Sequence, residues 1–198
     1  MKQTIVDRFA LNIARVQNLV TIYETTLAGA GRGRRSHQKT DVLRAAVVLL
    51  HASVEDVLRS LAYWKFPNAA VGILEQFPLV GNGPALKFNL GALAAHRGKS
   101  VDEVIKASVD SYLERSNYNN TIEVSSFLTQ IGLNVAAVNH TYPLLDDVMK
   151  RRHQIVHRAD KDEAGGQGNH MVRSLSPALV KNWVANVEVF VAAVLVQV

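Results

Sequence analysis

The chain of 198 residues contains no cysteine. This absence excludes disulfide bonds, a thiolate nucleophile, cysteine-held iron–sulfur clusters and every zinc site that uses cysteine. Aromatic residues are also few, at 7% of the chain, and only five residues are proline. Because a chain without cysteine suits a reducing compartment, we expect a cytoplasmic location.

Long apolar runs are missing as well. The most apolar stretch, 183–198, is interrupted by Glu188, and it is shorter than the roughly 20 residues that a membrane-spanning helix needs. At the N-terminus, Lys2, Asp7 and Arg8 lie inside an amphipathic pattern, whereas a secretory signal carries an uninterrupted apolar region. We therefore expect neither a membrane partner nor a targeting segment.

Apolar residues nevertheless make up 48% of the chain, which is enough for a sizeable core. We expect one domain over 1–198. There are 22 Lys and Arg against 17 Asp and Glu, so the net charge is +5. This excess permits a polyanionic partner without requiring one.

Helical periodicity runs through the sequence. Apolar residues three or four apart predict long helices over 3–28, 40–64 and 177–198. The apolar stripe expected on the second of them is Leu43, Val47, Leu50, Val54, Val57 and Leu61. Further helices are expected over 86–96 and from 141 to about 160. The last segment is rich in valine, but its four–three spacing favours a helix over a strand. Capping signals predict where helices begin: Thr40, Ser100 with Glu103, Asn120, and Ser176 before Pro177. The predicted fold is all-α, an antiparallel helical bundle with a helical insertion at 66–133.

The most informative segment is KRRHQIVHRAD, residues 150–160. On a straight helix, Arg152 falls in the middle of an apolar face, between Val148 and Ile155. A guanidinium on a buried face is costly unless it is paired, so Arg152 belongs either to a structural ion pair or to a functional site. The other cations point elsewhere on this projection: Lys150, Arg151 and Arg158.

His157 lies about 140° around the helix from Arg152. Histidine titrates near neutral pH and can move protons, whereas arginine offers a permanent positive fork to phosphate oxygens. Together they suit RNA cleavage without a metal, in which a base deprotonates the 2′-hydroxyl and a cation stabilises charge at phosphorus. The spacing by itself is not specific.

A second polar row lies along one edge of the helix predicted at 40–64. It consists of Arg44, His51, Glu55 and Arg59. These residues can form ordinary i,i+4 pairs on a solvated border. Alternatively, Glu55 contacts Arg152 across a helix–helix interface, which would explain a cation on an apolar face.

The two segments 41–61 and 141–160 resemble the HEPN superfamily of α-helical ribonucleases, and in particular its RiboL-PSP-HEPN group. The superfamily motif is an arginine, usually followed by a polar residue, with a histidine four to six residues further on. Arg152, His153 and His157 match it. Arg151 also satisfies the spacing, but it lies off the predicted apolar face, so we assign the motif to Arg152.

The resemblance implies a helical bundle that dimerises and joins two motifs in one composite site, which cuts RNA without metal or cofactor and leaves a 2′,3′-cyclic phosphate. It implies a toxin or antiviral effector, with an antitoxin or nucleotidyltransferase as a further partner. We expect His157 to act as general base or acid, Arg152 to stabilise the transition state and Glu55 to orient Arg152. The residues expected to contact substrate are Arg151, His153 and Arg158, and also His51, for which a satisfied polar position on the helix border is the favoured alternative.

Two other functions stay open. His153 and His157 are four residues apart, with Asp160 three further on, which is a spacing that zinc ligands use. A module that binds RNA or nucleotides, or only dimerises, without catalysis would also use the cations of 150–158 and of the loop holding Arg32, Arg34 and Arg35. Finally, we expect the last helix to pack in the core and to contribute to a dimer interface.

Overall fold

The computed structural model describes residues 1–29, 37–81, 90–161 and 172–198. In these ranges all regular structure is helical, and the sole β pairing is an isolated bridge between Lys161 and Val172. The predicted all-α class is confirmed. The α-helices are α1 (Lys2–Ile22), α2 (His37–Lys65), α3 (Val71–Leu74), α4 (Val101–Leu113), α5 (Thr121–Gln130), α6 (Tyr142–Arg158) and α7 (Pro177–Leu195).

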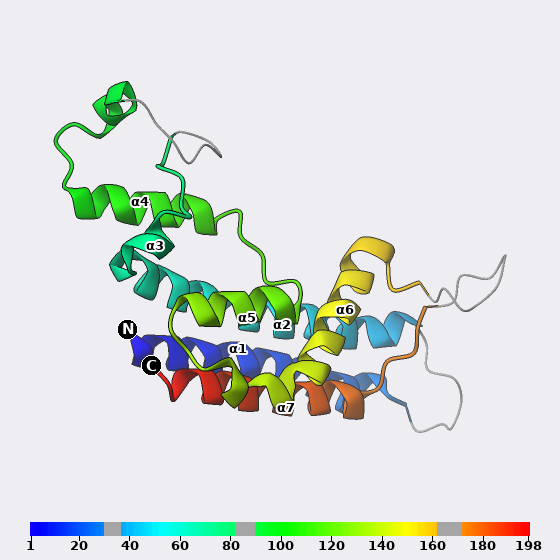
Figure 1. The fold of residues 1–198 in the computed structure, drawn as a ribbon. Helices are drawn as coiled ribbons and strands as arrows, with labels where there is room; N and C mark the ends of the chain where they lie inside the picture. The colour runs from blue at the N-terminus through cyan, green and yellow to red at the C-terminus, as the bar shows by residue number, and fades with distance from the viewer. Residues whose placement is uncertain (30–36, 82–89, 162–171) are drawn as a thin grey trace.

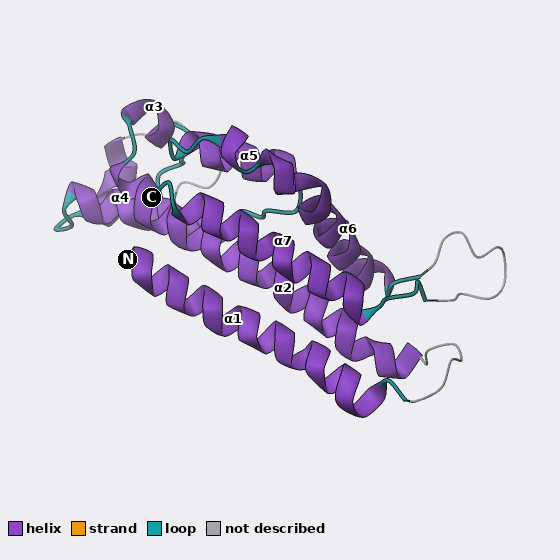
Figure 2. Cartoon of the chain, turned by 90° about the horizontal axis from the view of Figure 1, so that it is seen from below, coloured by secondary structure: helices purple, strands orange, loops and turns teal. Residues whose placement is uncertain are grey.

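Three long helices, α1, α2 and α7, lie side by side (Figures 1 and 2). Helix α1 runs antiparallel to the other two, so the N- and C-termini lie near each other at one end. At the opposite end, Lys181 Nζ at the start of α7 binds Glu24 Oε1 after α1 at 2.8 Å. Helix α6 crosses this layer at an angle and contacts both α2 and α7.

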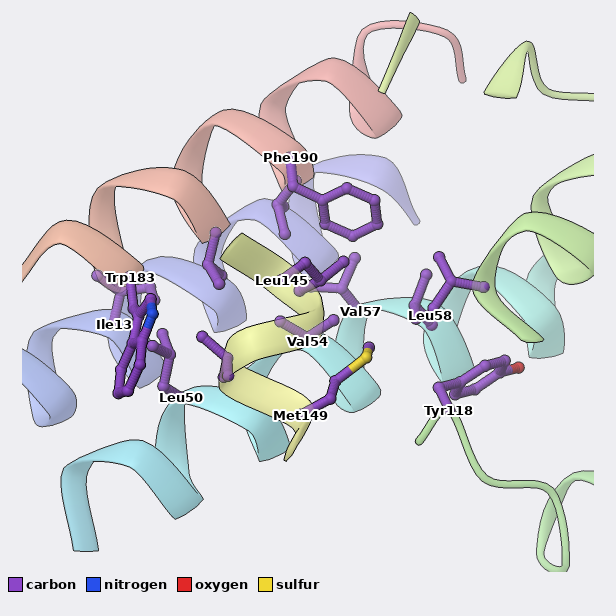
Figure 3. Close-up of a cluster of buried hydrophobic side chains, with 14 of the residues drawn as sticks. Ile13, Leu50, Val54, Val57, Leu58, Tyr118, Leu145, Met149, Trp183 and Phe190 are labelled. Atoms are coloured by element: carbon purple, nitrogen blue, oxygen red, sulfur yellow. The ribbon is translucent and has the colours of Figure 1, made fainter. Parts of the chain in front are cut away.

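The core lies where α6 crosses the layer (Figure 3). Leu145 and Met149 of α6 lie there beside side chains of α2 and α7. The apolar stripe expected on the second helix is confirmed, since its six members are buried: Leu43, Val47, Leu50, Val54, Val57 and Leu61. Burial of each such side chain stabilises the fold by about 1.5–3 kcal/mol before cavity effects.

Helix α7 is long and apolar enough, by length and composition, to cross a membrane. In the fold, the other helices of the bundle cover the inner face of α7. The prediction that this helix packs in the core is therefore confirmed. Eight of its side chains are buried: Val180, Trp183, Val184, Val187, Phe190, Val191, Val194 and Leu195. This is the packing of a core helix, and the single Glu188 faces outward.

Three of the four predicted caps are confirmed. Ser100 Oγ accepts a hydrogen bond from the Glu103 amide, and Glu103 Oε2 accepts one from the Ser100 amide. Asn120 and Ser176 likewise cap α5 and α7. Thr40 is not a cap, because α2 begins earlier, at His37. Its hydroxyl instead accepts a hydrogen bond from the buried Arg44 guanidinium at 2.7 Å, since a buried cation needs acceptors.

The segment 66–133 lies beside the end of α2 (Figure 1). It contains a 3-10 turn at Phe66–Asn68, then α3, a second 3-10 stretch at Leu90–His96, α4 and α5. The helix expected over 86–96 is therefore a 3-10 helix where it is described, and its first residues lie outside the described ranges. Aromatic rings hold parts of this segment together, because Phe66, which directly follows α2, contacts both Phe77 and Phe127.

Candidate functional site

The motif residues occupy the last two turns of α6. The helix ends at Arg158, two residues earlier than expected, because Ala159 (φ 47°) and Asp160 (φ 57°) adopt the left-handed conformation. That conformation reverses the chain and returns Asp160 towards the bundle, where its side chain is 1% exposed.

Our assignment of faces on α6 was right for Val148, which is buried, and for Ile155, which packs against the core, but wrong for the arginines. Arg151, expected to point away, is 5% exposed, whereas Arg152 is only half-buried. The apolar face also ends sooner than a straight projection suggests, since Val156 is 47% exposed. The reason is the crossing of α6 over the layer, because the fully buried side chains of the helix lie in its earlier turns, at Leu145, Val148 and Met149. Beyond them, the inward side of the helix faces Asp160 instead.

Arg44 and Arg151 share the carboxylate of Asp160. Asp160 Oδ2 accepts from Arg44 Nε at 2.7 Å and from Arg151 Nη2 at 2.8 Å. Both guanidinium groups also donate to the carbonyl of Arg173. Burial lowers the pKa of Arg151, and the charge of Asp160 opposes that shift. This cluster, which we call the arginine clamp, ties the start of α2 and the end of α6 to the segment before α7.

The clamp assigns Arg151 a structural part. We expected this side chain to contact substrate, but its guanidinium is buried against Asp160 and the carbonyls of Arg173 and Ser174. A cation held by three acceptors is not available to a phosphate. Of the two neighbouring arginines, Arg152 is thus the one that the clamp does not hold, although the helical projection that led us to it was wrong.

The positive charge of Arg152 acts on His51 of α2 and lowers the pKa of that imidazole. His51 is 1% exposed, and its Nε2 donates to the Tyr118 carbonyl at 3.2 Å. Its Nδ1 lies 3.7 Å from Glu55 Oε2. Burial is the main cause of the lowered pKa, whereas Glu55 and the Tyr118 carbonyl oppose it.

One expectation about this contact is corrected. Within the described ranges Glu55 Oε2 lies beside His51 Nδ1, and Glu55 forms no ion pair with Arg152. For His51, of the two possibilities left open, the satisfied polar position on the helix border is the one found, because the side chain is buried and bonded to a backbone carbonyl. It links α2 to the segment that carries Tyr118, and its neighbour Arg152 retains an accessible edge.

His153, His157 and Arg158 are exposed, on the side of α6 turned away from the core. The rings of His153 and His157 contact each other, with centroids 4.7 Å apart. A shallow pocket of about 290 Å³ lies beside His153. It is lined by Asn119, Met149, Lys150, His153, Gln154 and Arg158, and we call it the cationic pocket.

Arg152 and His157 do not converge within one chain. Arg152 is directed to α2, whereas His157 is exposed, and neither lines the cationic pocket. The rotation of about 140° between their positions on a helix accounts for this separation. One copy of the chain thus presents the two groups on different sides of α6.

The geometry disfavours the zinc alternative, because Asp160, its third ligand, is buried between two arginines. In the part of the chain that the structure describes, no group of three His, Asp or Glu side chains has a metal-binding arrangement. The other cations considered from the sequence, Arg32, Arg34 and Arg35, lie outside the described residues.

Sequence reasoning missed two features. The arginine clamp was missed because Arg44 and Asp160 are 116 residues apart, and no local pattern connects them. The second is a larger pocket of about 810 Å³ in the segment 66–133, floored by the aromatic rings of Phe66, Tyr118 and Phe127. Those rings lie on three different elements, so their spacing carries no signal.

No protein-family model, curated protein or solved structure matches this chain. Inferences about function therefore depend on the arrangement of side chains on α6 and around it.

Loss of the Asp160 charge should destabilise the protein. In Asp160→Asn the two buried guanidinium groups lose their shared anion, and we expect the free energy of unfolding to fall by about 3–5 kcal/mol. The matched control is Asp147→Asn, an exposed carboxylate on α6 whose change should stay within about 0.5 kcal/mol. Urea denaturation measures both. Equal stability of the two variants would show that the clamp is not structural.

Acid should weaken the fold through His51. Its folded pKa is lowered below the unfolded value of about 6.5, so the unfolded chain takes up the proton more readily. Stability is then full above that pH and falls as the pH falls through it. We expect His51→Gln, whose amide can still donate to Tyr118, to lose less stability than the parent between about pH 7.5 and about pH 5.5.

The control for this experiment is His140→Gln, because His140 is exposed. Its stability should depend on pH as the parent's does. Identical pH profiles for His51→Gln and the parent would contradict the role given to the buried imidazole.

Proposed function

We propose that this chain is a metal-independent endoribonuclease of the HEPN type, with a bundle and a composite active site of that superfamily. The observation that carries the proposal is the disposition of the last two turns of α6. They present an exposed pair of imidazoles and a partly exposed guanidinium that makes no ion pair or hydrogen bond within the described ranges. These are the catalytic groups that RNA cleavage by attack of a 2′-hydroxyl requires.

In the proposed reaction, His157 accepts the proton of the ribose 2′-hydroxyl. The 2′-oxygen attacks phosphorus, the bond to the 5′-oxygen breaks, and a second imidazole, in its protonated form, gives a proton to that leaving oxygen. The products are a 2′,3′-cyclic phosphate and a free 5′-hydroxyl. Arg152 stabilises the negative charge that develops on the phosphoryl oxygens.

A second copy of the chain is part of the proposal for a geometric reason. Arg152 and His157 of one chain lie on different sides of α6, so one subunit does not aim both groups at one phosphate. A dimer that brings two copies of α6 together supplies the missing group, and the second imidazole comes from the partner.

Neighbouring residues have supporting parts. Glu55, whose Oε2 lies 3.7 Å from His51 Nδ1, is assigned the part of orienting Arg152 through its negative charge. His153 and Arg158, together with Lys150, place substrate phosphates beside the cationic pocket. The biological role that we propose is a toxin or antiviral effector that an antitoxin or nucleotidyltransferase partner silences.

Replacing His157 tests the proposal. In His157→Ala we expect the rate of RNA cleavage to fall by about 10²–10⁴-fold, because general acid–base catalysis is lost. Fold and RNA affinity should persist, since the side chain is exposed and lines no pocket. The assay follows single-stranded RNA on a denaturing gel in the presence of EDTA, with end mapping for the cyclic phosphate.

The matched control is His140→Ala, an exposed histidine that precedes α6. It should cut RNA at the parental rate. Cleavage at the parental rate by His157→Ala would contradict the role of His157 as the general base. A parent protein that shifts RNA in a gel but leaves its length unchanged would establish the alternative, a binding module without catalysis.

The proposed composite site also predicts an oligomeric state. We expect light scattering at micromolar concentration to give about twice the chain mass of 21.7 kDa. A monomer that cuts RNA at full rate would contradict a site shared between subunits.

A further inference from the structure

The larger pocket lies between α4, α5 and the segment 76–81, in the middle of the chain. Its floor consists of the buried rings of Phe66, Tyr118 and Phe127. The rest of the lining includes the polar side chains of Gln76, Ser111, Ser116, Asn117, Ser126 and Gln130, one cation, Arg115, and one anion, Glu123. A cavity of about 810 Å³ with an apolar floor and a few polar groups has the size and lining of a ligand site.

Hydrogen bonds hold the walls of this pocket in place. The Val80 amide donates to Ser108 Oγ at 3.0 Å, which joins the segment 76–81 to α4. Gln130 Nε2 donates to Gln76 Oε1 at 3.0 Å and thereby joins α5 to the same segment. Arg59 of α2 donates to the carbonyls of Leu113 and Ser116, and so fixes the turn after α4. The pocket is thus formed before any ligand arrives.

The pocket adjoins the motif helix through three consecutive residues. Asn117 and Tyr118 line the larger pocket, and Asn119 lines the cationic pocket on α6. Three consecutive residues span about 7 Å from the first Cα to the last. The carbonyl of Tyr118, in the middle, accepts the hydrogen bond from His51, the neighbour of Arg152. The two pockets therefore lie next to each other and next to the candidate catalytic groups.

The two pockets match the two chemically different parts of a nucleotide, its base and its phosphate. The ring of Tyr112, which lines the larger pocket and is 41% exposed, and the side-chain amides of the lining can take an unpaired base, by stacking and by hydrogen bonds to its edge. Lysine, arginine and histidine take a phosphate. We propose that the larger pocket binds a base of single-stranded RNA while the adjoining phosphate lies in the cationic pocket. The pocket thereby selects unpaired RNA and sets base preference, an inference that rests on the proposed function.

A bulky side chain in the larger pocket tests this directly. Ser126 is exposed on α5 and lines the pocket, so Ser126→Trp fills it without disturbing the core. The matched control is Thr129→Trp, which is equally exposed on the same helix but outside the pocket. Both changes are made in His157→Ala protein, so that binding is measured without cutting.

The probes are four fluorescein-labelled homopolymer RNAs and an abasic ribose–phosphate oligomer of the same length, read by anisotropy. Ser126→Trp should weaken binding of the preferred homopolymer about tenfold, the loss expected for one stacked base. Thr129→Trp should bind as the parent does. The abasic oligomer should bind all three proteins equally, because it needs only the phosphate contacts.

A second variant keeps the proposal testable if Ser126→Trp does not fold. Asn117→Ala removes an exposed amide from the rim and should reduce the preference among the four homopolymers. Parental affinity in both variants, or equal affinity of the parent for abasic and base-containing RNA, would overturn the base pocket.

Failure of this inference is distinct from failure of the nuclease proposal. If His157-intact protein cuts RNA while Ser126→Trp leaves affinity and cleavage unchanged, the base pocket is wrong and the nuclease stands. If no RNA is cut but Ser126→Trp selectively weakens base-containing RNA, the pocket stands and the nuclease proposal falls.

Discussion

The structure around α6 depends on one buried carboxylate shared by two arginines. Asp160 is positioned between Arg44 and Arg151 by the left-handed turn that ends the helix. Separating these charges would leave uncompensated ions in the interior, which costs far more than the loss of a surface pair. The clamp therefore fixes where α6 stops and which of its side chains remain at the surface.

The clamp itself adds little net charge to the candidate site. Arg44 also pairs with the exposed Asp41, with Nη1 and Oδ1 3.2 Å apart, so the two arginines are balanced by two carboxylates. At the surface of α6, Lys150 pairs with Asp146, and Arg152 and Arg158 lie on the same helix. The positive charge that could attract a polyanion to the end of α6 therefore comes from these surface cations and not from the clamp.

The segment 66–133 gains a functional interpretation from its contact with α6. Tyr118 contributes its ring to the floor of the larger pocket and its carbonyl to His51, and Asn119 extends to the cationic pocket. A conformational change at this point would move the aromatic floor, the buried imidazole and the charge of Arg152 together. The candidate catalytic groups and the candidate base pocket are thus parts of one connected surface.

The helices and their caps could be predicted because their causes are local. The stripes of α2 and α7 and the caps at Ser100, Asn120 and Ser176 each depend on residues within a few positions of one another. Which of Arg151 and Arg152 is the buried cation could not be predicted. Neighbouring residues on a helix differ by only about 100° in direction, and the angle at which α6 crosses the layer selects one of them. The partner of Arg44 lies 116 residues away, at Asp160. Charge pairing and pockets of that kind arise only when distant segments pack, and no periodicity along the chain encodes them.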